Sequence, residues 1–412
     1  MSSLGVWWDR HQVGALEQLG ERSREYTFRY TGGGRAISLA LPVRQEPYGV
    51  FESRAFFEAL LPEGTLRERI ASQLKVASSD SFGLLAELGR DCAGALQILE
   101  GTRMSEVPSV DWLDDGQLDT LIAELPRHPL GIREGDERMR LSLAGVQNKA
   151  VLVQGESHRY GRPLSGMPST HIFKPEPADA VYPGLAVNEF FCMRLAELCG
   201  LPTASVEIRS IGGGQCLIVE RYDRDRSVWP PRRVHQEDLC QALGIPPDFK
   251  YQHPDQRLPS YRALAELLDG NSAAPGVDRL RAATAIVFHF LVGNADAHAK
   301  NISLVHHGDG VRLAPLYDVV STAAYPELNR DLAISIGDEF DPDAIGPTQW
   351  QDLAGDFGLN AGQFARTRSS LADRVSRTAA ELRTEALADG WHDPRIETVL
   401  ETVSARAAQV KD

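Results

Sequence analysis

Residues 293–303 read Gly-Asn-Ala-Asp-Ala-His-Ala-Lys-Asn-Ile-Ser, and residues 314–321 read Ala-Pro-Leu-Tyr-Asp-Val-Val-Ser. In the first stretch Asp296 precedes Asn301 by five positions. In the second, Asp318 follows a segment that we expect to form a β-hairpin. This order and spacing of a carboxylate, an amide and a second carboxylate is typical of phosphoryl-transfer enzymes of the protein-kinase type.

The expected roles of these three side chains follow from the chemistry of that reaction. One carboxylate is needed at the attacking hydroxyl, and an amide oxygen and a second carboxylate are needed on the metal. We therefore expect Asp296 to be the catalytic base or the carboxylate that orients the substrate. Asn301 and Asp318 are expected to bind Mg²⁺, which prefers oxygen ligands. A lone loop aspartate more often caps a turn, but the apolar segment 282–292 before the loop and the hairpin after it favour catalysis.

His298 and Lys300 lie inside the same loop. Lys300 is predicted to assist the transferred phosphoryl group electrostatically, although a lysine beside aspartates also suits an exposed surface. His298 has two open interpretations, an anchor that holds the loop by hydrogen bonds or a group that acts next to the phosphate. His289, on the apolar segment, is predicted to be a core histidine with satisfied hydrogen bonds.

A kinase also needs a lysine on a strand to bind the nucleotide phosphates. Lys174 fits, because residues 170–176 read Thr-His-Ile-Phe-Lys-Pro-Glu, an apolar strand that delivers one lysine and ends at a proline. Its ion-pair partner is expected from the next helix, predicted over residues 187–199, where Glu189 lies in the first turn. The helix dipole alone also favours an acidic residue there, and both interpretations stay open.

The loop that covers the phosphates should precede this strand. Residues 141–150, Leu-Ser-Leu-Ala-Gly-Val-Gln-Asn-Lys-Ala, contain small residues at which backbone N–H groups can approach phosphate. These are Ser142, Ala144 and Gly145, and Lys149 is either a further phosphate ligand or a solvent-facing side chain. The segment is not a Walker A loop, and it lacks the multiple glycines of an ordinary kinase loop.

A hinge for the adenine ring is expected where the last apolar strand meets the helical part of the chain. Residues 217–224 read Leu-Ile-Val-Glu-Arg-Tyr-Asp-Arg. Backbone N–H and C=O groups there would bind the base, and Glu220 and Tyr222 would frame it. A strand edge with surface charges explains the composition equally well.

Composition and charge are those of an ordinary soluble globular chain. Its 412 residues are 42% hydrophobic and 24% charged, which suffices for more than one domain. No membrane span or secretory signal is apparent, and the five cysteines form no CxxC pair, so we expect a cytoplasmic protein with reduced thiols. The net charge of −14 argues against DNA binding by this chain alone, but not against binding through a basic partner.

The order of the expected elements predicts an α+β chain in three parts. Residues 1–104 form a small α+β unit, 105–233 a β-rich lobe, and 234–412 a helical lobe with the catalytic and metal-binding segments. Strands followed by helices are the order of a two-lobed kinase. Strands are expected at residues 26–30, 37–41, 95–99, 141–153, 170–174, 205–208 and 215–221. Helices are expected at residues 53–61, 82–88, 116–125, 187–199 and 282–292, and through most of 234–412.

These ordered motifs together resemble the HipA family of serine/threonine-protein kinase toxins from bacterial type II toxin–antitoxin systems. The resemblance extends over nearly the whole chain. It is carried by residues 57–64, 89–95, 142–149, 171–174, 188–189, 219–224, 236–240, 296–301 and 317–321. The chain departs from the family pattern at Tyr222, where some members carry Phe. It also departs at Val146 and Asn148, where others carry Ala and Glu.

The resemblance implies a two-lobed protein-kinase-like fold with a β-rich N-lobe, an all-helical C-lobe and an additional N-terminal α+β subdomain. It implies ATP and Mg²⁺ as cofactors, Asp296 as the catalytic aspartate, and Asn301 and Asp318 as metal ligands. Lys174 becomes the phosphate-binding lysine. Ser142 matches the serine whose autophosphorylation inactivates family members by expelling the phosphate loop. A phosphoserine there would add about −1.5 to −2 charge beside the nucleotide phosphates.

The resemblance also implies a substrate and a partner. Family substrates are translation factors, chiefly an aminoacyl-tRNA synthetase (the glutamyl enzyme), and their phosphorylation causes growth arrest and persistence. The family partner is a small HipB-like helix-turn-helix antitoxin, which would supply the basic DNA-binding surface that this acidic chain lacks.

Two alternatives remain. A small-molecule or lipid kinase shares the Asp-x4-Asn loop, but the N-terminal subdomain and the lack of a basic amphipathic segment disfavour it. A catalytically weak corepressor that acts with a DNA-binding antitoxin is disfavoured by the complete set of expected catalytic side chains, which are Lys174, Asp296, Asn301 and Asp318.

Overall fold

The chain folds as two compact units. The computed structural model describes residues 2–20, 23–32, 34–101, 107–131, 147–176, 182–308 and 310–411. The first unit consists of Met1–Pro175 and Ser210–Pro247, and the second of Glu176–Arg209 and Asp248–Asp412. Residues 176–209 of the predicted β-rich lobe therefore belong to the second unit.

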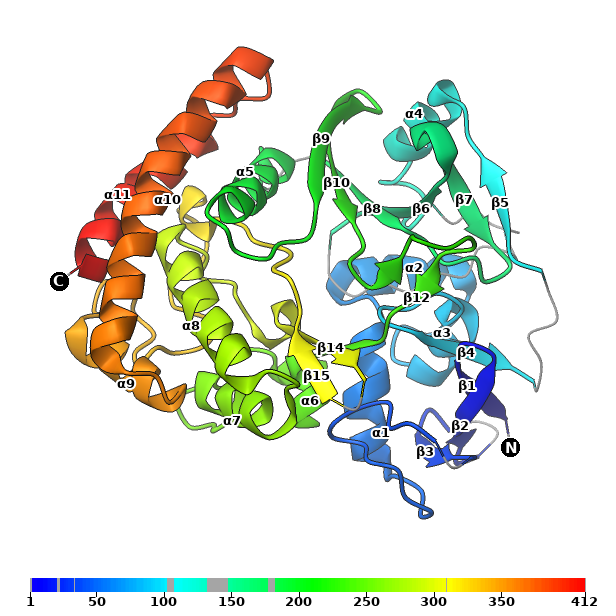
Figure 1. Ribbon diagram of the computed structural model, residues 1–412. Helices are drawn as coiled ribbons and strands as arrows, with labels where there is room; N and C mark the ends of the chain where they lie inside the picture. Colours follow the sequence, from blue (N-terminus) through cyan, green and yellow to red (C-terminus); the bar gives the residue numbers. More distant parts are fainter. Residues whose placement is uncertain are drawn as a thin grey trace. The chain divides into compact units, whose positions relative to one another are not determined.

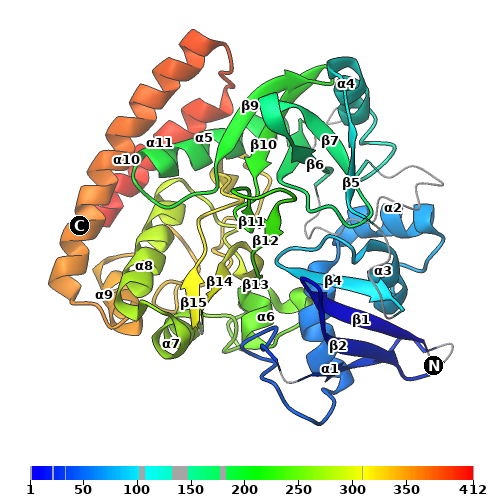
Figure 2. The same cartoon turned by 45° about the vertical axis from the view of Figure 1, so that its right-hand side comes forward.

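The first unit begins with an antiparallel sheet in the order β3-β2-β1-β4. Figure 2 shows β1 and β2 side by side, with β4 on the other side of β1. Leu4, Val6 and Trp8 alternate along β1 and are buried in the same core, as expected for one face of a strand. The strands are β1 (Ser3–Trp8), β2 (His11–Gln18), β3 (Tyr26–Tyr30) and β4 (Leu96–Glu100).

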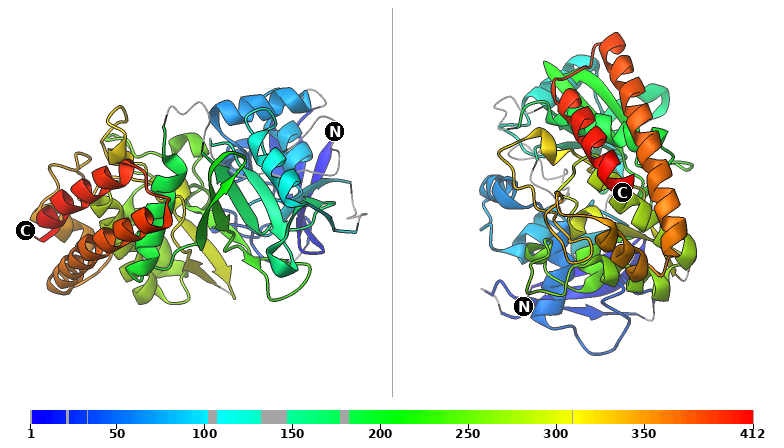
Figure 3. Two further views of the ribbon diagram at one scale, coloured as in Figure 1. Left: turned by 90° about the horizontal axis from the view of Figure 1, so that it is seen from above. Right: turned by 90° about the vertical axis from the view of Figure 1, so that its left-hand side faces the viewer.

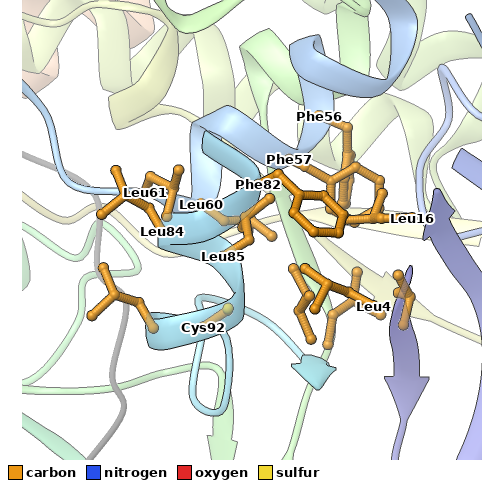
Figure 4. Packing of buried hydrophobic residues seen from close by; sticks show 14 of the residues in the cluster. Leu4, Leu16, Phe56, Phe57, Leu60, Leu61, Phe82, Leu84, Leu85 and Cys92 are labelled. Carbon is orange, nitrogen blue, oxygen red and sulfur yellow. The ribbon is translucent and has the colours of Figure 1, made fainter. Parts of the chain in front are cut away.

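Short helices cover this sheet and share its core. Figure 4 shows Phe56 and Phe57 from α1 and Leu84 and Leu85 from α3 packed with Leu4 of β1. Each fully buried side chain of this kind contributes about 1.5–3 kcal/mol to folding. The helices are α1 (Val50–Phe57), η1 (Glu58–Leu60), α2 (Gly64–Leu74) and α3 (Ser81–Leu88). The predicted helix over residues 53–61 corresponds to α1 and η1.

The strand predicted at residues 37–41 is wrong. The segment forms a tight turn in which the Leu41 N–H donates to the Ser38 carbonyl at 3.2 Å. The buried Ser38 hydroxyl donates to the Glu237 carboxylate at 2.6 Å. Tertiary hydrogen bonds to a distant carboxylate thus override the strand-like alternation of apolar residues.

The rest of the first unit is built on a second antiparallel sheet, with β5, β7, β6, β8 and β10 as successive neighbours. Helix α4 packs on this sheet through Leu121 and Ile122. The strands are β5 (Ser109–Trp112), β6 (Ala150–Gln154), β7 (Tyr160–Leu164), β8 (His171–Pro175) and β10 (Gly214–Glu220), and α4 spans Asp115–Ala123. Strand β9 (Val206–Ile211) brings the chain back from the second unit.

Short elements complete the first unit. They are η2 (Glu156–His158), β11 (Arg224–Asp225), β12 (Arg232–Arg233), β13 (Gln236–Asp238) and α6 (Leu239–Leu243), and η3 (Pro247–Phe249) follows at the boundary. Strands β11 and β12 pair antiparallel. The part that the sequence predicts to be mostly helical, from residue 234 onward, therefore begins with the short strand β13, and its first helix is α6.

The described part of the second unit is mainly helical and contains the hairpin β14–β15, which lies where the sequence predicts it. Helix α8 packs against α7, α10 and α11. Figures 1 and 3 show α10 and α11 side by side. The helices are α5 (Leu185–Leu198), α7 (Tyr261–Asn271), α8 (Pro275–Leu291), η4 (Ala299–Asn301), η5 (Thr322–Ala324), α9 (Pro347–Asp356), α10 (Ala361–Asp389) and α11 (Arg395–Lys411). The strands are β14 (Ser303–His307) and β15 (Gly310–Leu313).

No helix within the described part of the chain is both long enough and apolar enough to cross a membrane.

Candidate active site

The loop 293–301 leaves the end of α8, the apolar helix that the sequence predicts. Buried residues such as Val287 and Phe290 fix the helix in the core of the second unit. Gly293 then turns the chain with φ = 68°, a left-handed conformation that favours glycine. A Cβ at this position would lie 2.7 Å from Thr402 Cγ2 and 2.8 Å from Ala323 Cβ. Both the conformation and the space at residue 293 therefore require glycine.

Asn294 connects the loop to the helix behind it. Its Nδ2 donates to His289 Nδ1 at 3.0 Å, and its Oδ1 accepts from the Asp296 N–H at 3.0 Å. Burial lowers the pKa of His289 to about 4, so the ring is neutral and Nδ1 can accept this bond. His289 is thus the satisfied core histidine that the sequence predicts. Asn294, which sequence reasoning missed, is one of the residues that orient the start of the loop.

Thr322 binds the loop from the opposite side. Its hydroxyl accepts from the Ala295 N–H at 2.8 Å and donates to the Gly293 carbonyl at 3.0 Å. The Ala323 N–H donates to the same carbonyl at 3.1 Å. The loop therefore rests on the segment that follows Asp318, a contact with no signal in the sequence.

Asp296 lies at the exposed tip of this otherwise well-packed loop. Its backbone carbonyl accepts from the His298 N–H at 2.8 Å and from Asn301 Nδ2 at 3.2 Å. Its carboxylate Oδ1 accepts from the Tyr251 hydroxyl at 2.8 Å. The structure thus brings Asp296 and Asn301 together, as the spacing predicts. It adds Tyr251, which sequence reasoning missed.

His298 and Lys300 face inward from the loop, and each is 7% exposed. The His298 ring packs edge-on against the Tyr251 ring, with 5.3 Å between centroids. The Lys300 carbonyl accepts from the Tyr317 hydroxyl at 2.6 Å. This packing suits a histidine that anchors the loop. Direct roles of both side chains at the phosphate stay predictions.

The segment around Asp318 is held from two sides. Tyr317, its neighbour, bonds to Lys300, the neighbour of Asn301, so the two predicted metal ligands belong to adjoining segments. Asp318 itself has φ = 56°, an uncommon left-handed conformation for a residue with a side chain. Such conformations persist where the surroundings enforce them.

Asn188 of α5 enforces this path a few residues further on. Its Oδ1 accepts from the Ser321 N–H at 2.9 Å, and its Nδ2 donates to the Ser321 carbonyl at 3.0 Å. Asn188 is fully buried. In the sequence, Asn188 belongs to a stretch that carries the family resemblance, but nothing there predicts this contact.

The donors present suit a hard divalent cation. Asn301 offers an amide oxygen, because its Nδ2 is used on the Asp296 carbonyl, and Asp318 offers a carboxylate. No cluster of three or more His, Cys, Asp or Glu side chains able to hold a metal occurs among the described residues. A cation here would therefore take its remaining oxygens from nucleotide phosphates and water, as Mg²⁺ does in kinases.

The predicted phosphate-binding residues lie in the first unit. Lys174 is on β8 opposite Leu217 of β10 and is 8% exposed. Lys149 directly precedes β6 and is 6% exposed. Both lysines are buried instead of facing solvent. Ser142, Ala144 and Gly145 lie outside the described residues, and their predicted roles stay predictions.

Glu189 lies on α5 in the second unit and is 1% exposed. The Glu176 carboxylate accepts from the N–H groups of Gly184 and Ala186 and fixes the start of this helix. Lys174 and Glu189 belong to different units, and their ion pair stays a prediction.

Each of the two predicted hinge residues has a side-chain partner, and their role at the adenine ring stays a prediction. Glu220 ends β10 and pairs with Arg226 at 2.8 Å. The Tyr222 hydroxyl donates to Gln236 Oε1. Between them the Arg221 side chain turns inward and is 4% exposed.

Arg221 belongs to a buried ionic cluster that joins the predicted hinge to the N-terminal part of the first unit. Asp91 accepts from Arg224 at 2.9 Å and from Arg233 at 3.0 Å, and Asp223 accepts from Arg221 at 2.8 Å. Burial alone would raise the pKa of Asp91, but attraction to the three arginines outweighs it, so the pKa lies well below its usual range. The cluster fixes the backbone on both sides of Tyr222.

Known protein families match both parts of the chain. The HipA N-terminal domain matches residues 4–99, and the HipA-like C-terminal domain matches residues 141–386. The protein Y4mE of Sinorhizobium fredii, which is named as a kinase, is 38% identical over 99% of this chain and 98% of its own length. The serine/threonine-protein kinase toxin HipA of Shewanella oneidensis is 31% identical over 79% of this chain and 76% of its own.

A solved structure shows the same fold. It contains HipA and HipB of Shewanella oneidensis with their operator DNA. The matched chain is 27% identical, with a TM-score of 0.80 over 99% of this chain and 96% of that one. The predicted α+β, kinase-like fold is thereby confirmed, and the chain is a serine/threonine-protein kinase. It belongs to the HipA family of kinase toxins.

Proposed function

We propose that this kinase transfers the γ-phosphoryl group of ATP, with Mg²⁺, to a serine or threonine hydroxyl of a protein. The observation that carries the proposal is the loop 293–301, which presents an exposed Asp296 on a rigid, buried base. In this proposal Asp296 orients the acceptor hydroxyl and takes its proton, while Asn301 and Asp318 hold the cation. His298 supports the loop, and Lys300 adds positive charge near the transferred group.

The residues that the sequence predicts to bind the nucleotide complete this proposal. Lys174 binds the phosphates and Glu189 is its partner. Ser142, Ala144, Gly145 and Lys149 form the phosphate loop, and Glu220 and Tyr222 frame the base. We further propose that autophosphorylation of Ser142 switches the enzyme off, because a phosphoserine would repel the ATP phosphates. The support for this proposal is the family resemblance of residues 142–149.

We also propose that the enzyme is the toxin of a toxin–antitoxin pair. Its substrate would be a translation component, with an aminoacyl-tRNA synthetase favoured, and phosphorylation would stop growth and produce persistence. Its partner would be a HipB-like antitoxin, since the Shewanella oneidensis relative is solved with HipB and operator DNA. The antitoxin would also provide the contact to DNA, because this chain carries a net charge of −14.

The decisive experiment is the Asp296→Ala variant. Loss of a catalytic carboxylate is expected to lower phosphoryl transfer by about 10²–10⁴-fold, measured with labelled ATP. It should also relieve growth inhibition when the chain is expressed without an antitoxin. Asp352→Ala changes another exposed aspartate, on α9, and should leave both readouts unchanged. An Asp296→Ala protein that stays fully active and toxic would falsify the proposed mechanism.

The same assay separates the alternative functions. A corepressor would show no ATP turnover in the wild-type chain. A small-molecule or lipid kinase would turn over ATP without labelling protein. Phosphoproteomics of cells that express wild type or Asp296→Ala would then identify the protein substrate.

A further inference from the structure

Hydrogen bonds fix residues 250–252 to the loop 293–301 and to residues 333–335. The Lys250 carbonyl accepts from the Ala299 N–H at 3.1 Å, and the Gln252 N–H donates to the Ala333 carbonyl at 2.9 Å. Gln252 Oε1 accepts from the Ser335 N–H at 2.9 Å. The residue between these two anchors, Tyr251, is therefore placed by backbone hydrogen bonds on both sides.

The Tyr251 side chain reaches the carboxylate at the tip of the loop. Its hydroxyl donates to Asp296 Oδ1 at 2.8 Å. Its ring packs edge-on on His298 at an interplanar angle of 84°, which fixes the direction of the hydroxyl. Tyr251 is nevertheless 38% exposed, so it lies at the surface where a protein substrate must approach.

The effect of this contact on Asp296 follows from its geometry. A carboxylate at an exposed loop tip can rotate about its last side-chain bond, and only some orientations point an oxygen at an incoming hydroxyl. A hydrogen bond from a fixed phenol to Oδ1 selects one orientation and leaves Oδ2 for the acceptor. Hydrogen bonds to charged oxygens are among the stronger ones in proteins.

We propose that Tyr251 is a positioning residue for phosphoryl transfer, which acts by holding Asp296 Oδ1 so that Oδ2 faces the acceptor hydroxyl. This inference rests on the proposed role of Asp296. Tyr251 donates its hydrogen bond throughout and gives up no proton, so the acceptor's proton passes to Asp296. The residue thus sets the rate of transfer and not the affinity for ATP.

The test is Tyr251→Phe, which removes the hydroxyl and keeps the ring against His298. Loss of a hydrogen bond to a charged group is expected to lower kcat by about tenfold to a hundredfold. The KM for ATP and the thermal unfolding temperature should stay unchanged. Tyr48→Phe is the matched control, because it removes another hydroxyl that donates to a single acceptor, a backbone carbonyl in the first unit. It should leave kcat at the wild-type value.

A double variant shows whether the effect passes through Asp296. If it does, Tyr251→Phe lowers kcat in the wild-type background but does not lower the residual activity of Asp296→Ala further. Replacement of Tyr251 by 4-aminophenylalanine, which restores a donor, should recover most of kcat.

The outcomes distinguish this inference from the function on which it rests. An inactive Asp296→Ala protein together with a Tyr251→Phe protein of wild-type kcat would overturn the inference alone. An additional loss in the double variant, or a Tyr251→Phe effect confined to KM or stability, would overturn it too. A fully active Asp296→Ala protein would instead overturn the proposed function.

Discussion

Asp91 and Asp296 are two aspartates in opposite surroundings. Asp91, in the first unit, is 1% exposed and accepts charged hydrogen bonds from arginines, among them Arg224 and Arg233. Asp296, in the second unit, is exposed and is held by neutral groups. These are the Tyr251 hydroxyl on its carboxylate and the side-chain amides of Asn294 and Asn301 on its backbone.

The difference shows how the two units use charge. Arginines around a carboxylate stabilise its ionised form and remove its affinity for a proton. That suits Asp91, which joins the predicted hinge to the N-terminal part of its unit, and it would not suit the base that we propose. Among the described residues, the side-chain partners of Asp296 named above are neutral groups, an arrangement that fits the base that we propose.

The largest expected change in stability comes from the buried ionic cluster around Asp91. Asp91→Asn leaves Arg221, Arg224 and Arg233 buried with one carboxylate fewer, and breaking a buried ion pair from one side costs about 3–5 kcal/mol. We expect a loss of that size in the free energy of unfolding, measured with urea. Asp111→Asn is the control, because its pair with Arg162 is 44% exposed on the aspartate side. It should cost less than about 1 kcal/mol.

The pH dependence of wild-type unfolding should report the same cluster. The pKa of Asp91 is lowered in the folded state, so its contribution is present above the unfolded value of about 4 and is lost as pH falls below it. The Asp91→Asn variant should lack this part of the acid sensitivity. If Asp91→Asn lost stability in acid as steeply as wild type, the assignment of this pH dependence to Asp91 would be contradicted.

The next largest effect is expected at Gly293, the turn that starts the loop 293–301. Gly293→Ala combines a left-handed φ of 68° with contacts of 2.7 Å and 2.8 Å to neighbouring methyl groups. Strain and overpacking together are expected to cost about 2–4 kcal/mol and to lower kcat by displacing Asp296. Gly390→Ala separates backbone strain from overpacking, because Gly390 has φ = 76° but nothing within 4 Å of its Cβ position. Equal losses in both variants would show that the close contacts do not matter.

The smallest expected change in stability comes from His289, the buried histidine of α8. Burial lowers the pKa of His289 to about 4 from 6.5, so between these values the unfolded chain binds a proton that the folded chain does not. Stability should therefore fall by about 1–2 kcal/mol from pH 7 to pH 5. His289→Gln removes this titration and can still accept the hydrogen bond from Asn294. The variant should therefore lose less stability between pH 7 and pH 5. His253→Gln, at an exposed site in the same unit, should lose as much stability over this pH range as wild type.

Much of the site was predictable because its chemistry is local in the sequence. The interval between Asp296 and Asn301, the apolar helix before them and the hairpin before Asp318 are all short-range patterns. The strand around Lys174 and the helix with Glu189 followed from hydrophobic periodicity and a proline stop. The core role of His289 followed from its place on an apolar helix.

The supports of the site were not predictable because they join residues far apart in the chain. Asn188 binds Ser321 across 133 positions, and Tyr251 reaches Asp296 across 45. An asparagine in a helix or a tyrosine in a loop carries no local mark of such a partner. The same reason explains the wrong strand at residues 37–41, where Glu237 captures Ser38 from 199 positions away.

The sequence alone was sufficient to establish the order of the chemical groups, the kinase class and the family resemblance, because these depend on residue type and short spacing. Tertiary structure alone decided which neighbours orient those groups. It also decided which carboxylates are buried against arginines and which stay exposed. Periodicity reports that a side chain is apolar or polar, but hydrogen bonds and burial depend on which distant residues meet. Asp91 and Asp296 are the same residue type, and only folding assigns one to the scaffold and the other to the proposed chemistry.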